Sequence, residues 1–158
     1  MKRALVRMAV LVLAAVLIAA IVNTVRPRGL RWIAAYAEVY PPPPPATDLV
    51  TKDEVAAAID AGVPIIDART AEKYRQGHIP FAHNLPSHEA PERLAEVFQW
   101  APRTEDLIIV YCGGVECDDS VPVRNLLIES GFTNVKLYLG GWQEWTGANM
   151  PVEVPAEP

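Results

Sequence analysis

The sequence is poor in cysteine, and it lacks the excess of positive charge that binding to nucleic acids requires. Only 2 of the 158 residues are cysteines, too few for a disulfide framework that would staple a small fold. The formal net charge is −5, whereas proteins that read polyanions carry a basic patch. Nucleic acid is therefore excluded as the expected partner. The length suits one ordinary domain with an accessory segment.

Apolar residues are concentrated near the N-terminus instead of being spread along the chain. An uncharged run begins at Met8 and ends at Val25, between Arg7 and Arg26, and its first fifteen residues are all apolar. As a helix, this run would cover nearly the hydrocarbon thickness of a bilayer. We therefore expect a basic leader at 1–7 and a transmembrane helix, a signal anchor, at 8–25. A cleaved signal peptide and a buried core helix are the alternatives.

The charges beside this run indicate an orientation for the anchor. Lys2, Arg3 and Arg7 join the terminal amine on the N-terminal side, against three arginines soon after the run. The positive-inside rule then places the N-terminus in the cytoplasm. We expect a single-pass protein of the cell membrane, with its domain on the extracytoplasmic (periplasmic) side.

A linker at 26–46 separates this segment from the rest of the chain. It contains Trp32, Tyr36 and Tyr40, aromatic residues of the kind found at membrane interfaces, and then five consecutive prolines at 41–45. Such a run forms an extended polyproline II rod. We interpret it as a stiff spacer; a docking ligand for an aromatic groove is the alternative.

The remainder predicts one α/β domain at 47–150, followed by a short tail at 151–158. Apolar runs typical of buried strands alternate with helical segments, and Thr51 with Glu54 fits a capping box. The expected strands are 63–68, 107–111 and 135–139, and the expected helices are 51–61, 91–100, 121–130 and a short last one containing Trp142 and Trp145. This alternation predicts a parallel sheet with helices on both faces. The two tryptophans are best explained by core packing; an aromatic platform for a substrate is the alternative.

Cys112 stands directly after the predicted strand 107–111, where ligands of parallel sheets bind. It is followed by Gly113 and Gly114 and then by a predicted helix. A loop of this kind aims successive amide N–H groups inward, and the helix dipole adds partial positive charge. Both effects would stabilise a thiolate or a persulfide on Cys112. An unreactive buried cysteine is the alternative.

Three ordered blocks of sequence resemble the rhodanese homology domain. They are IIDARTAEKYRQGHIPFAHNLP at 65–86, LIIVYCGGVECDDSVPVRNLL at 107–127 and LYLGGWQEW at 137–145. The resemblance implies a single rhodanese-like domain without a cofactor or metal. It also implies a sulfur relay, in which Cys112 takes the outer sulfur of a small donor such as thiosulfate and passes it to a thiol or cyanide-like acceptor.

The same resemblance implies roles for further residues. The amides of the loop would bind the anionic sulfur, and the loop residues concerned are Gly113, Gly114, Val115, Glu116, Cys117 and Asp118. Asp67 and Arg69 match the first block. We interpret them as a buried structural salt bridge, with contact between Arg69 and an incoming anion as the alternative. His78 falls in the Gly-His-Ile-Pro turn, and we interpret it as structural and not as a metal ligand.

The loop departs from the family pattern in two ways. It contains no Arg or Lys but three acidic residues, Glu116, Asp118 and Asp119, and carboxylates repel an anionic donor such as thiosulfate. Asp119 or Ser120 is expected to cap the following helix. The loop also holds Cys117, which would form a disulfide with Cys112, resolve its persulfide, or only pack inside the loop.

Three functions fit these residues. The leading one is a membrane-anchored sulfurtransferase that works through a Cys112 persulfide. A non-catalytic binding or sensory module on the same scaffold and a thiol-redox protein using Cys112 and Cys117 are the alternatives. The sequence identifies no partner protein.

Overall fold

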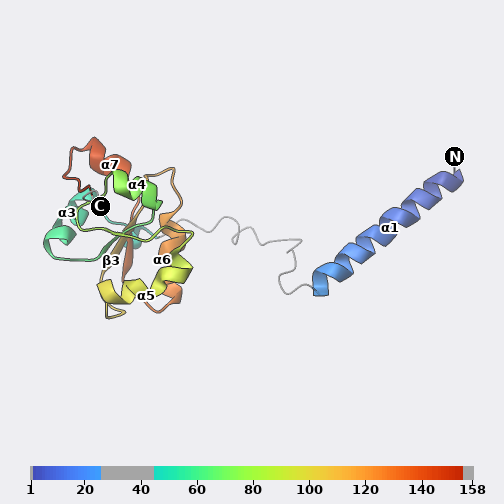
Figure 1. The fold of residues 1–158 in the computed structure, drawn as a ribbon, viewed down its shortest axis with the longest axis horizontal. Helices are drawn as coiled ribbons and strands as arrows, with labels where there is room; N and C mark the ends of the chain where they lie inside the picture. Colours follow the sequence, from blue (N-terminus) through green and yellow to red (C-terminus); the bar gives the residue numbers. More distant parts are fainter. Residues whose placement is uncertain (1, 26–44, 155–158) are drawn as a thin grey trace. The chain divides into compact units, whose positions relative to one another are not determined.

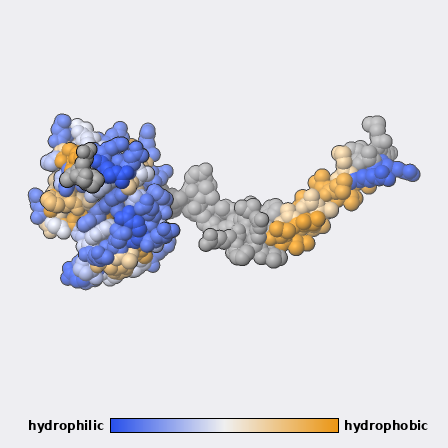
Figure 2. Space-filling model, in the orientation of Figure 1, coloured by the Kyte–Doolittle hydropathy of each residue, from blue (hydrophilic) through white to orange (hydrophobic). Residues whose placement is uncertain are grey.

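The computed structural model describes residues 2–25 and 45–154, which belong to two compact units, Met1–Pro43 and Pro44–Pro158. The first unit contains the helix α1 (Lys2–Val25). Large apolar side chains of this helix, from Val6 to Val22, are exposed, and hydrophobic residues cover much of its surface in Figure 2. The helix begins before the predicted boundary at residue 8, because the leader contains no glycine or proline that would end it.

A search of residues 2–25 and 45–154 finds no helix whose length and apolar character suffice to cross a membrane. The structure therefore does not support the transmembrane helix predicted at 8–25. Most of the predicted linker, including Trp32, Tyr36, Tyr40 and the first four residues of the proline run, lies outside the described residues. The same holds for residues 155–158 of the tail.

The second unit is built on a parallel sheet of four strands (Figure 1). These are β1 (Ile65–Asp67), β2 (His83–Asn84), β3 (Ile108–Tyr111) and β4 (Val135–Tyr138), in the order β2-β1-β3-β4. Every residue of β1 and β3 is buried, as expected for the central strands of a sheet that is covered on both faces. The predicted parallel α/β fold is confirmed.

Five α-helices surround the sheet, preceded by a single 3-10 turn, η1 (Ala46–Asp48). They are α3 (Lys52–Asp60), α4 (Ala71–Gln76), α5 (Ala90–Trp100), α6 (Ser120–Glu129) and α7 (Gly141–Gly147). Val97 of α5 and Leu127 of α6 belong to one hydrophobic cluster, whereas Val55 of α3 and Trp145 of α7 belong to another. Because β1 and β3 contribute side chains to both clusters, the helices lie on both faces of the sheet, as predicted.

Local sequence signals explain several of these boundaries. Thr51 and Glu54 form the predicted capping box at the start of α3, and Gly62 follows that helix with φ +70°, a conformation that favours glycine. The sequence did not predict α4 or β2. With six and two residues, these elements are too short to show an apolar period.

Candidate active site

The site lies where β3 ends and the chain turns into α6. Cys112 directly follows Tyr111, the last residue of β3, and only 2% of its surface is exposed. The loop of residues 113–119 then leads to Ser120, the first residue of α6. Gly114 has φ +150°, which a side chain would disfavour. The predicted order of strand, cysteine, glycine loop and helix is confirmed.

The Cys112 sulfur is held between the loop and the first turn of α6. Its thiol donates a hydrogen bond to the carbonyl oxygen of Cys117 at 2.8 Å, and the buried hydroxyl of Ser120 donates to Sγ at 3.4 Å. The sequence predicted Ser120 only as a candidate cap at the start of the helix, and nothing in the local pattern indicated this contact with Cys112.

The carbonyl oxygen of Cys117 lies where the sequence predicted a site for an anionic sulfur. A carbonyl oxygen accepts hydrogen bonds, so its position suits a protonated thiol on Cys112. An anionic sulfur at this position would require the Cys117 peptide to turn, because the negative sulfur and the partly negative carbonyl oxygen would otherwise repel each other. The loop as it stands thus binds a resting thiol, and the expected cradle of amides around the anion stays a prediction.

The start of α7 fastens the loop to the domain. The amide of Trp142 donates to the carbonyl of Cys112, and the amide of Gln143 donates to the carbonyl of Gly113, both at 2.9 Å. Gly141, with φ +54°, lies so close that an added Cβ would be 2.5 Å from the Cys112 oxygen and 2.9 Å from the Gly114 nitrogen. This close approach is the structural role of the Gly-Gly-Trp turn.

Gly141→Ala is therefore expected to lower the free energy of unfolding by about 2 kcal/mol or more, because a strained φ and an overpacked contact each cost about 1–3 kcal/mol. Urea unfolding measures this change. Gly147→Ala in the same helix is the control, because nothing lies within 4 Å of its added Cβ. Equal effects of the two substitutions would contradict the contact between Gly141 and the loop.

Cys117 is half-buried in the same loop, and its thiol contacts Asp119. Its thiol donates to Oδ2 of Asp119 at 3.4 Å, while Oδ1 of Asp119 accepts a hydrogen bond from Ser87 at 2.9 Å. Burial, followed by the neighbouring Cys112 thiol, raises the pKa of Cys117 to about 11, against the amides of Asp119 and Gly113, which lower it. Both cysteines are free thiols in this structure.

The expectation that Asp119 or Ser120 caps α6 with its side chain is wrong. Asp119 occupies the N-cap position but makes no capping hydrogen bond with its side chain. Its carboxylate instead joins Ser87 and Cys117, a pairing across the chain that the local sequence could not reveal. The other loop residues, Val115, Glu116 and Asp118, are exposed.

Asp67 and Arg69 form a buried ion pair at the end of β1. Their side chains are 0% and 3% exposed, with Nη2 and Oδ2 separated by 2.6 Å. The hydroxyl of Tyr111 donates to the same carboxylate at 2.6 Å, and Arg69 also donates to the carbonyl of Gly77. These contacts favour the interpretation of a structural salt bridge over contact with an incoming anion.

The ion pair reaches the cysteine loop through Trp142. The Arg69 guanidinium lies 4.5 Å from the centre of the Trp142 ring, and the amide of Trp142 holds the Cys112 carbonyl. Trp145 is buried at 1% exposure and Trp142 is partly buried against the same hydrophobic cluster, which confirms core packing for both residues. Trp142 in addition contacts the ion pair and the loop.

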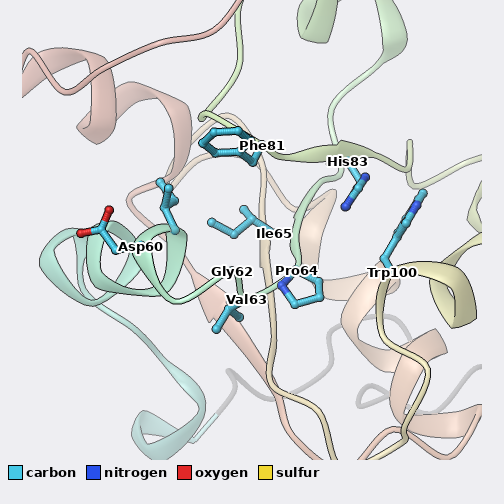
Figure 3. Close-up of a pocket in the computed structure, with 9 residues that line it drawn as sticks. Asp60, Gly62, Val63, Pro64, Ile65, Phe81, His83 and Trp100 are labelled. Carbon is cyan, nitrogen blue, oxygen red and sulfur yellow. The ribbon is translucent and has the colours of Figure 1, made fainter.

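A pocket of about 350 Å³ lies at the amino end of β1, and residues that line it are drawn in Figure 3. Cys112 follows the carboxyl end of β3, which runs parallel to β1, so the pocket lies at the opposite edge of the sheet. Pro64, Ile65, Phe81, His83 and Trp100 are among the residues that line it. The His83 and Trp100 rings stack 4.3 Å apart.

His78 is buried and stacks on Tyr74 at 3.8 Å, in line with the structural role predicted for it.

Comparison with known proteins identifies the family of this fold. The model of the family described as "Rhodanese-like domain" matches residues 51–148. The chain is 35% identical over 108 residues to the HTH-type transcriptional regulator Rv0324 of Mycobacterium tuberculosis. This match covers 67% of this chain and 45% of that protein. It is 35% identical over 71 residues to the thiosulfate sulfurtransferase PspE of Escherichia coli, which covers 45% of this chain and 64% of that protein.

A solved structure shows a similar fold. The crystal structure of the BH2092 protein from Bacillus halodurans superimposes with a TM-score of 0.58 at 28% identity, covering 67% of this chain and 76% of that one. The chain spans less than two thirds of the length of the two curated relatives named above, 45% of the regulator and 64% of the sulfurtransferase.

Proposed function

This chain belongs to the rhodanese-like domain family, and on that premise we propose that it is a sulfurtransferase that carries a sulfane sulfur on Cys112. The relatives include a thiosulfate sulfurtransferase. The observation that carries the proposal is the position of Cys112, a free thiol at the carboxyl end of β3, held by Ser120 and by the start of α7.

The proposed reaction has two covalent steps. The Cys112 thiolate attacks the outer sulfur of a donor such as thiosulfate; a new S–S bond forms on Cys112 and the old S–S bond breaks, so that sulfite leaves. A thiol or cyanide-like acceptor then attacks the outer sulfur of the Cys112 persulfide, and the thiolate is restored. Both steps are nucleophilic substitutions at sulfur, so the reaction needs no cofactor.

The surroundings of Cys112 support this chemistry. The Ser120 hydroxyl, which donates to Sγ at 3.4 Å, stabilises a thiolate at this position because it offers a hydrogen bond to the charged form. When the sulfur becomes anionic, the peptide of Cys117 turns its carbonyl away, and Gly113 and Gly114 give the loop the freedom to do so.

Steady-state assays test the proposal. The full chain is mixed with thiosulfate and cyanide, and separately with an organic persulfide and an excess of a thiol. The transferred sulfur is measured as thiocyanate in the first assay, and in the second as the sulfide that a further thiol releases from the product persulfide. Turnover that depends on both substrates and follows ping-pong kinetics is expected. Absence of turnover with every donor would sink the sulfurtransferase and leave the binding or sensory module, which the acidic loop also suits.

The acidic residues of the loop are expected to weaken the use of thiosulfate. Glu116 and Asp118 are exposed in the loop that carries Cys112, and their charges repel a dianion over several ångströms. The double substitution Glu116→Gln with Asp118→Asn should therefore raise kcat/KM for thiosulfate by about threefold or more at low ionic strength, and the gain should shrink as salt screens the charges.

The matched control removes two carboxylates elsewhere. Asp53→Asn with Glu105→Gln changes the net charge equally, and both side chains are strongly exposed, at 91% and 67%. This variant should leave kcat/KM for thiosulfate unchanged. An equal gain in both variants would show that net charge, and not the loop, governs the approach of the donor.

Attachment to a membrane is a separate part of the proposal. It rests on the uncharged run at 8–25 and on the exposed apolar side chains of α1, because a helix that is apolar on every side is stable in apolar surroundings. The flanking charges favour a domain on the extracytoplasmic side.

Fractionation of cells tests the attachment. The full chain should remain with membranes after an alkaline wash, whereas a chain without residues 2–25 should be released. Protease added to cells with a permeable outer envelope should digest the domain if it lies outside the cytoplasmic membrane. A full chain that behaves as a freely diffusing protein would contradict the attachment.

A further inference from the structure

We propose that Cys117 acts as a built-in acceptor that attacks the Cys112 persulfide, releases hydrosulfide and leaves a disulfide between the two cysteines. This inference rests on the proposed function, because it needs the persulfide as its starting point. It goes further by naming the product, sulfide, and the class of reductant that must complete the cycle.

The two cysteines of the chain meet inside one loop. The Cys112 thiol donates a hydrogen bond to the carbonyl oxygen of Cys117 at 2.8 Å, and the neighbouring Cys112 thiol is one cause of the raised pKa of Cys117. The Cys117 side chain in turn packs on the residue after Cys112, since a Cβ on Gly113 would lie 3.3 Å from the Cys117 Cβ and 3.6 Å from its Sγ. Glycine at position 113 thus leaves room for Cys117 beside the reactive sulfur.

The surroundings of Cys117 set the order of events. Burial and the neighbouring Cys112 thiol raise the pKa of Cys117 to about 11, so Cys117 stays protonated near neutral pH. A protonated thiol is a poor nucleophile. Cys117 therefore does not compete for the donor, and Cys112 becomes persulfidated first.

Asp119 supplies a place for the proton that Cys117 must lose. Its Oδ2 lies 3.4 Å from the Cys117 sulfur, and its Oδ1 is held by the Ser87 hydroxyl at 2.9 Å. The carboxylate is thus oriented toward the thiol as a general base is oriented toward its substrate. The structure gives this acidic residue a use that the sequence did not indicate.

The step balances in atoms and electrons. The Cys117 sulfur, having lost its proton to Asp119, attacks Sγ of Cys112; the bond between Sγ and the outer sulfur breaks, and the outer sulfur leaves as hydrosulfide. The sulfane sulfur is reduced and the two cysteines are oxidised to a disulfide. A dithiol, or two molecules of a monothiol, then reduces that disulfide by thiol–disulfide exchange and is itself oxidised to a disulfide.

A single-turnover experiment tests the inference. The reduced full chain is freed of thiols, mixed without oxygen with one equivalent of thiosulfate, and followed by intact mass and by released sulfide. Because the chain has only 2 cysteines, each product has one assignment. The wild type should release one sulfide per chain and lose two hydrogens. Cys117→Ser should stop one step earlier, gaining one sulfur atom and releasing no sulfide.

Each other outcome overturns a stated part. A wild type that keeps the extra sulfur, with Cys117 still open to alkylation, overturns the inference and leaves the proposed function standing. If neither protein gains or releases sulfur, with thiosulfate or with inorganic polysulfide, the proposed function fails and the inference with it. The wild-type measurement decides even if the Cys117→Ser protein does not fold.

Asp119→Asn tests the proton transfer separately. Formation of the disulfide should slow by about 10-fold or more at neutral pH, since a positioned general base contributes at least that much. The deficit should shrink as the pH approaches the pKa of Cys117, about 11, where the thiol ionises unaided. A deficit that is constant with pH would indicate a purely structural role and would remove Asp119 from the step.

Discussion

Replacement of Cys112 by serine is expected to abolish sulfur transfer, with a fall in kcat of about 10³-fold or more. A serine hydroxyl cannot form a persulfide, and burial, the largest cause of the raised pKa of Cys117, persists in this variant and disfavours Cys117 as a substitute nucleophile. The measurement is thiosulfate- and acceptor-dependent turnover of the full chain. The same variant should not gain sulfur in a single turnover.

The fold of this variant should survive, which separates catalysis from stability. Serine is close to cysteine in size, and its hydroxyl can donate to the Cys117 carbonyl in place of the thiol, so the expected loss of stability is about 1 kcal/mol. Thermal unfolding and far-UV circular dichroism check this. Full turnover by a folded Cys112→Ser protein would refute the assignment of Cys112 as the nucleophile.

The largest expected effect on stability follows from Arg69→Ala. This change leaves the Asp67 carboxylate, which is 0% exposed, without its cation, and breaking a buried ion pair on one side costs about 3–5 kcal/mol. It also removes the guanidinium that lies over Trp142. Since a domain of this kind has a total stability of about 5–15 kcal/mol, urea unfolding should show a large fall in the midpoint.

Two further variants make this prediction specific. Asp67→Asn combined with Arg69→Met removes both charges and should recover part of the loss, because no unpaired charge stays buried. Arg103→Ala breaks a pair at the surface, whose guanidinium is 71% exposed and whose Asp106 carboxylate is 18% exposed, and should cost no more than about 1 kcal/mol. A similar cost for Arg69→Ala and Arg103→Ala would show that the buried pair does not stabilise the domain.

The ion pair also illustrates how loss of stability would spread to the site. Arg69 supports Trp142, and the amide of Trp142 holds the carbonyl of Cys112. Activity of Arg69→Ala at a temperature where it stays folded therefore reports on the loop alone. A loss of activity in this folded variant would identify the pair as a positioning element that acts on the loop through Trp142.

The sequence by itself determined the fold class and the position of Cys112 at the end of a central strand. Apolar runs separated by helical segments predicted a parallel sheet, and in such a sheet the residue after a central strand lies at the edge where ligands bind. This placed Cys112 at the site. The capping box of Thr51 and Glu54 fixed the start of α3 from local sequence alone, because both of its hydrogen bonds join neighbours on the chain.

Only the tertiary structure decided what surrounds Cys112. The bond between Ser87 and Asp119 joins residues 32 positions apart, and it turned an expected helix cap into a partner of Cys117. The contact of the Cys112 thiol with the Cys117 carbonyl depends on how the loop folds back, which its hydrogen bonds to α7 help to set. Such hydrogen bonds form only when segments distant in the sequence pack together, so they cannot be predicted from the local sequence.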